Sequence, residues 1–152
     1  MNLATELPRL LPKAIAWAEV EATAAAESGR SLDASEVRLA QSVGVSQPER
    51  VRVAVVHSLP TPEDADLRAA ALLTGLLGPA MVGLTLGHSI LICRGHEATS
   101  LLTHELRHVQ QYENAGSIAA FLPAYLQQIV MFGYANAPLE RDARAHEVVD
   151  RC

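Results

Sequence analysis

Two histidines with a glutamate beside the first are the residues of this 152-residue chain best suited to chemistry. They stand in His104-Glu105-Leu106-Arg107-His108, an H-E-x-x-H pattern. In a helix, residues four apart lie one above the other on one face, so both imidazoles can hold a single metal ion. Glu105 then lies beside that ion and can act as a general base on a water molecule. The pattern predicts the helical half of a zinc hydrolase site.

The sequence around this pattern predicts a partly buried helix over residues 97–114. Its apolar stripe consists of Ala98, Leu101, Leu102, Val109 and Tyr112. Glu105 and His108 fall inside this stripe, where a carboxylate and an imidazole need partners to offset the cost of burial. A metal ion with its water is such a partner. The alternative is a surface helix on which the pattern arose by chance.

A zinc hydrolase site takes three protein ligands and leaves a fourth position for water. The best candidate for the third ligand is Glu140, which follows Asn136-Ala137-Pro138 in the first turn of an expected helix. A glutamate at that position can also simply stabilise the helix dipole, so both interpretations stay open. The fallback ligands are Asp142, His146 and Glu147.

Length and composition predict one domain over residues 1–152, because 49% hydrophobic residues can form a substantial core. The net charge of −5, without a block of Lys or Arg, argues against nucleic acid as a partner. Cys93 and Cys152 do not form a disulfide framework, and Cys152 could be a free thiol. The N-terminus does not resemble a signal peptide, which favours a cytoplasmic protein. Secretion without a cleaved signal peptide stays open.

Two uncharged stretches, 69–93 and 114–139, are long enough to cross a membrane. Glycine and proline interrupt both, so we expect buried elements joined by turns and no membrane span. The apolar region 117–134 nevertheless suggests a helix covered by a second copy of the chain or by a protein partner.

The hydrophobic periodicity predicts an α+β fold, mostly helical with a small sheet of two to four strands. Strands are expected at 51–56 and within 81–93, where two strands could meet at Gly87. One short helix should open with a capping box at Asp33 and Glu36, and another with Thr61 as its cap and Pro62 in its first turn. The remaining helices are expected at 6–28, 97–114, 122–132 and 136–149.

The H-E-x-x-H helix, the strand before it and the downstream Glu140 resemble the gluzincin zinc metallopeptidases. The run H-E-L-R-H-V-Q-Q from His104 to Gln111 is similar to small bacterial minigluzincin-like peptidases, and the resemblance covers about 81–147. It implies a zincin-like domain in which zinc binds His104, His108 and Glu140. It further implies Glu105 as the base and a peptide or protein substrate aligned along an edge strand within 81–93.

One position departs from the family pattern. Many gluzincins place an aspartate four residues after the ligand glutamate, where it supports a zinc histidine, and here that position is Arg144. The support must therefore come from elsewhere, with Asp142 or Glu147 as candidates. The donor that stabilises the oxyanion also stays open among Tyr134, His146 and Arg144.

Two other functions compete with the peptidase. A catalytically silent gluzincin-like module could hold zinc for structure and act as a partner-binding or assembly protein. Glu105 argues against it, because structural zinc does not need a base. A di-iron helical bundle would need a second E-x-x-H, which the sequence lacks.

Overall fold

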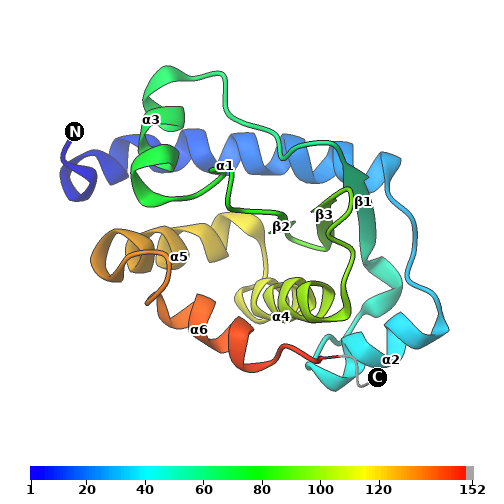
Figure 1. Ribbon diagram of the computed structural model, residues 1–152. Helices are drawn as coiled ribbons and strands as arrows, with labels where there is room; N and C mark the ends of the chain where they lie inside the picture. Colours follow the sequence, from blue (N-terminus) through cyan, green and yellow to red (C-terminus); the bar gives the residue numbers. More distant parts are fainter. Residues whose placement is uncertain (150–152) are drawn as a thin grey trace.

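The computed structural model describes residues 1–149, which form six α-helices and one three-stranded sheet (Figure 1). This confirms the predicted α+β fold with a small sheet. The elements in chain order are α1 (Leu3–Ser28), α2 (Ala34–Ser42), the short 3-10 helix η1 (Pro48–Arg50), β1 (Arg52–Val56), α3 (Ala65–Thr74), β2 (Gly83–Leu86), β3 (Ser89–Cys93), α4 (Thr99–Ala115), α5 (Ile118–Phe132) and α6 (Pro138–Ala145). The predicted free thiol of Cys152 lies outside the described residues.

The sheet has the strand order β1-β3-β2. β1 pairs parallel with β3, and β2 pairs antiparallel with β3 through a tight turn at Gly87, whose φ of 66° suits glycine. The two strands therefore meet at Gly87 as the sequence predicts. β2 lies at the edge of the sheet and packs on α4.

The two faces of the sheet bury different helices, because successive side chains of a strand point to opposite sides. Ala54 and Leu91 belong to an apolar cluster with α1 and α5. Val53, Ile90 and Ile92 belong to a second cluster with α2 and α4. Figure 1 accordingly shows α1 on one side of the strands and α4 on the other. This packing fixes the position of α4 relative to edge strand β2.

Two predicted helix starts are wrong. α3 begins at Ala65 rather than at Thr61-Pro62, because the side chain of Asp64 caps it by accepting the N–H of Leu67. α5 begins at Ile118 rather than near 122, because Ser117 accepts the N–H of Ala120. Pro123 consequently lies inside α5, whereas a helix starting near 122 would have placed it in the first turn. Burial of the apolar face of α5 outweighs the hydrogen bond that this proline removes.

The predicted last helix, 136–149, is too long. α6 ends at Ala145, and residues 146–149 continue as irregular chain. The backbone N–H of Val148 donates to Thr103 Oγ1 at 2.8 Å, so this segment is bound to α4. The early end of α6 matters for the site, because it lets Glu147 turn back toward α4.

The region 117–134 is partly covered within the chain. α5 packs on α1, while Met131 and Phe132 near its end remain exposed. A partner on this region stays a prediction. Within residues 1–149, no single helix meets the length and hydropathy criteria for crossing a membrane. Helices α4 and α5 meet these criteria only when they are counted as one segment, and the chain bends by 116° between them.

Candidate metal centre

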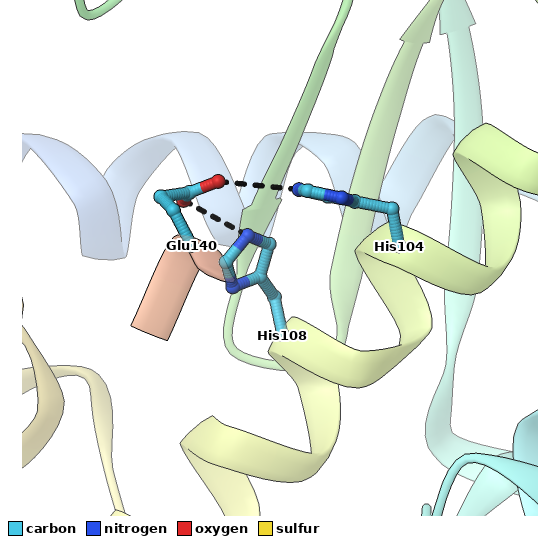
Figure 2. Close-up of side chains that lie close together, drawn as sticks. All are labelled: His104, His108 and Glu140. Atoms are coloured by element: carbon cyan, nitrogen blue, oxygen red, sulfur yellow. Dashed lines mark hydrogen bonds and ion pairs between the residues drawn. The ribbon is translucent and has the colours of Figure 1, made fainter. Parts of the chain in front are cut away.

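The H-E-x-x-H pattern lies in the middle of α4, and the first turn of α6 faces it. The side chains of His104, His108 and Glu140 come together there, as Figure 2 shows. His104 Nε2 lies 3.2 Å from Glu140 Oε1, and His108 Nε2 lies 3.0 Å from Glu140 Oε2. Glu140 is 1% exposed, so this carboxylate is part of the protein core rather than a surface cap. The structure thus brings all three predicted ligands into one buried cluster.

The cluster fits a metal ion with mixed nitrogen and oxygen ligands. One donor atom from each of the three residues lies within 4.8 Å of the others. Ligands about 2 Å from a tetrahedral metal lie about 3.3 Å apart, close to the observed contacts between Nε2 and the carboxylate. The Nδ1 atoms are engaged elsewhere, His104 with Glu147 at 2.9 Å and His108 with Gln111 at 2.8 Å. Both Nε2 atoms are therefore directed at the position that an ion would occupy.

The charges of these side chains shift one another's pKa values. Burial disfavours charge on His104, but Glu140, Glu105 and Glu147 outweigh it and raise the His104 pKa to about 9. The pKa of His108 is raised in the same way against burial, chiefly by Glu140 and Glu105. Burial works against the charge of Glu140, but its hydrogen bonds to both histidines hold its pKa far below the ordinary value. An incoming metal ion must displace protons from the histidines, because ligand nitrogens bind unprotonated.

Glu105 lies beside the cluster, with Oε2 at 4.0 Å from His104 Nε2. Thr85 on β2 donates its hydroxyl to Glu105 Oε1 at 2.9 Å. Burial is the main influence on Glu105 and raises the pKa of its carboxyl group, although the two histidines oppose this. β2 approaches so closely that a Cβ at Gly83 would lie 3.1 Å from Glu105 Oε2. Glu105 is therefore a buried carboxylate placed between the candidate ligands and the edge strand.

A second layer of contacts orients the candidate ligands. Tyr125 on α5 donates its hydroxyl to Glu140 Oε2 at 2.7 Å. Gln111, besides contacting His108, donates to the Leu139 carbonyl and to Asp142 Oδ2, both at 2.9 Å. These bonds fix α6 against α4, so that the first turn of α6 is held opposite the histidines.

The fallback ligands have other partners. Asp142 pairs with Arg107 at 2.8 Å and with Gln111, and His146 donates from Nδ1 to the Asp142 carbonyl at 2.7 Å. Glu147 contacts His104 Nδ1, the far side of the ring from Glu140. Of the two residues that the sequence offered as support for a ligand histidine, Asp142 and Glu147, it is Glu147 that contacts the His104 ring directly. Asp142 reaches His108 only indirectly, by accepting a hydrogen bond from Gln111, which contacts His108.

The three candidate oxyanion donors differ in their surroundings. Arg144 donates to the Ala135 carbonyl, and His146 is engaged by the backbone of α6. Tyr134 borders the same cavity as Glu105 and Glu140, and burial followed by the charge of Glu140 raises its hydroxyl pKa. Of the three candidates, only Tyr134 lines the cavity beside Glu105 and Glu140. Its raised pKa keeps its hydroxyl protonated and able to donate.

Four residues around the cluster were not predicted from the sequence, namely Gly83, Thr85, Gln111 and Tyr125. Gln111 left a local signal, because a residue three positions after His108 shares its helix face. The others lie on different elements, so nothing near them in the sequence points to the cluster.

Comparison with known proteins gives no relative from which a function could be transferred. The chain matches no protein-family model, no curated protein and no solved structure. The gluzincin resemblance of 81–147 therefore stays a prediction.

Proposed function

We propose that this protein is a zinc-dependent metallopeptidase of the gluzincin type, with zinc held by His104, His108 and Glu140. The observation that carries the proposal is the convergence of both Nε2 atoms on the Glu140 carboxylate at 3.0–3.2 Å. Two imidazoles and one carboxylate form the donor set of several catalytic zinc sites, which keep a fourth position for water. The accompanying buried Glu105 favours catalysis over purely structural zinc, because a structural site needs no adjacent base.

Held by His104, His108 and Glu140, zinc would act as a Lewis acid that lowers the pKa of water and polarises a carbonyl group. Glu105 takes a proton from the attacking water and later delivers it to the leaving amine. Burial supports this role by raising the Glu105 pKa toward the working pH of a general base. Thr85 holds one carboxylate oxygen by a hydrogen bond and thereby orients the other. Tyr134 donates its hydroxyl to the oxygen on which negative charge develops.

In this proposal the substrate peptide lies along the edge strand β2. This edge strand packs on α4 and runs next to Glu105, which supports strand addition as the mode of substrate binding. In such binding, backbone hydrogen bonds give affinity without regard to sequence, and pockets for alternate side chains give selectivity.

Metal analysis of the purified protein, with peptide cleavage in parallel, tests the proposal. We expect about one zinc per chain in the wild type and in the exposed-site control Glu63→Ala, and a sharp loss in Glu140→Ala. Glu105→Gln should keep zinc and lose hydrolysis of a peptide library. Absence of zinc in reloaded wild type would overturn the metal site. Equal cleavage by wild type and Glu105→Gln would overturn the mechanism, and zinc without any cleavage would favour the silent module.

A further inference from the structure

An apolar cavity of about 140 Å³ opens directly onto the candidate metal centre. It lies among α1, α3, α5 and the edge strand β2. Helix α1 packs against both α3 and α5 (Figure 1). Glu105, His108 and Glu140 border one end. Among the described residues, these are the acidic and basic groups that line it. The rest of the lining comes almost entirely from apolar side chains.

The size of the cavity matches one large side chain. A cavity of about 150 Å³ lined by leucine, isoleucine and phenylalanine stays dry and accepts benzene. Here Leu7, Leu10 and Trp17 from α1 and Ile129 from α5 supply a comparable lining. Leu7 and Trp17 are only partly buried, so this part of the lining lies near the surface of the protein.

The cavity also adjoins the strand that would hold a peptide. All four residues of β2, Gly83–Leu86, line it, together with Glu105. Successive side chains of an extended peptide point in opposite directions, so a peptide along β2 can place one side chain in the cavity. The backbone next to that side chain then lies beside Glu105.

We propose that this cavity binds one large apolar side chain, aromatic or branched aliphatic, of a peptide substrate next to the cleaved bond. This inference rests on the proposed peptidase function and adds the substrate class to it. Burial of the side chain in an apolar space favours binding, whereas a lysine or aspartate would lose its hydration without gaining a partner. Peptides with Phe or Leu at that position should exceed those with Ala by about 10- to 100-fold in kcat/KM.

Trp17 allows the cavity to be tested without zinc or catalysis. It is the single tryptophan of the chain and lines the cavity. We expect its fluorescence in the metal-free protein to change on titration with acetyl-Ala-Ala-Phe-Ala-Ala-amide, and to change far less with Ala or Lys in place of Phe. The same responses to all three peptides would overturn the inference, whatever the outcome for zinc.

Filling the cavity provides the second test. Ala71→Phe places a ring from α3 in the cavity, and Ala70→Phe does so from the neighbouring lining position if the first variant does not fold. Ala65→Phe is the matched control, because Ala65 is exposed on the same helix. We expect the filled variants to keep zinc but to lose the Trp17 response and the Phe preference, and Ala65→Phe to keep both.

The two proposals fail differently. An active zinc enzyme whose cleavage of a peptide library shows no preference for large apolar residues would overturn the substrate class and leave the peptidase intact. A protein without zinc or cleavage would overturn the peptidase, while the Trp17 titration would still report whether the cavity binds apolar side chains.

Discussion

Replacing Glu147 by alanine should weaken zinc binding about tenfold. Glu147 Oε2 lies 2.9 Å from His104 Nδ1 and so fixes which ring nitrogen faces Glu140. Removing a partner of this kind usually costs about 10- to 100-fold in metal affinity, or about 1.4–2.7 kcal/mol. The Glu147 side chain is 35% exposed, so water can replace part of the lost hydrogen bond. The lower end of the range is therefore expected.

Competition with a chromophoric zinc chelator measures this affinity directly. Glu147→Gln should recover most of it, because the amide oxygen can still accept the proton of His104 Nδ1. Exposed Glu63 serves as the control, and Glu63→Ala should bind zinc like the wild type. Thermal unfolding of the metal-free variants checks that each variant still folds.

Unchanged zinc affinity in Glu147→Ala would refute the reasoning. It would mean that packing alone orients the His104 ring, or that Gln111 and Tyr125 fix the cluster without help from the segment after α6. A loss in Glu147→Gln as large as in Glu147→Ala would point instead to the negative charge, rather than the hydrogen bond, as the contribution of this residue.

Three further predictions follow from contacts around the cluster. Tyr125→Phe leaves Glu140 Oε2 without its 2.7 Å donor, and urea unfolding of the metal-free protein should show a loss of about 1–3 kcal/mol. Glu113→Gln should cost about 1–2 kcal/mol at pH 7, because Glu113 accepts two backbone N–H groups. Burial tends to raise the Glu113 pKa, but the two N–H groups and the imidazole of His88 hold this pKa below its ordinary value of 4.5. The free energy of unfolding of the wild type should therefore exceed that of Glu113→Gln by the full amount above pH 4.5. This difference should vanish as the pH falls through the lowered pKa, and urea titrations at several pH values measure it. Gly83→Ala brings a Cβ to 3.1 Å from Glu105 Oε2, so peptide cleavage should fall while zinc content stays unchanged.

The helix that carries the H-E-x-x-H pattern was predictable because its determinants are local. The spacing of His104 and His108 fixes their common face through the geometry of one helix, whatever the rest of the chain does. The capping box of Asp33 and Glu36 and the turn at Gly87 are equally local, and both are confirmed. The place of Glu140 in a helix start makes it the best candidate for the third ligand, with the helix dipole as the alternative explanation of a glutamate there.

Tertiary structure supports the ligand interpretation, because it buries the Glu140 carboxylate against both histidines. The meeting of Glu140 with the histidines depends on how α5 reverses the chain and on the bonds that hold α6 against α4, including those of Gln111. The roles of Glu147 and Tyr125 required the observed end of α6 and the observed packing of α5. The apolar cavity is likewise a property of several packed elements, none of which encloses it alone. Residues within one helix are placed by its backbone geometry, whereas residues on different elements meet only where packing brings those elements together.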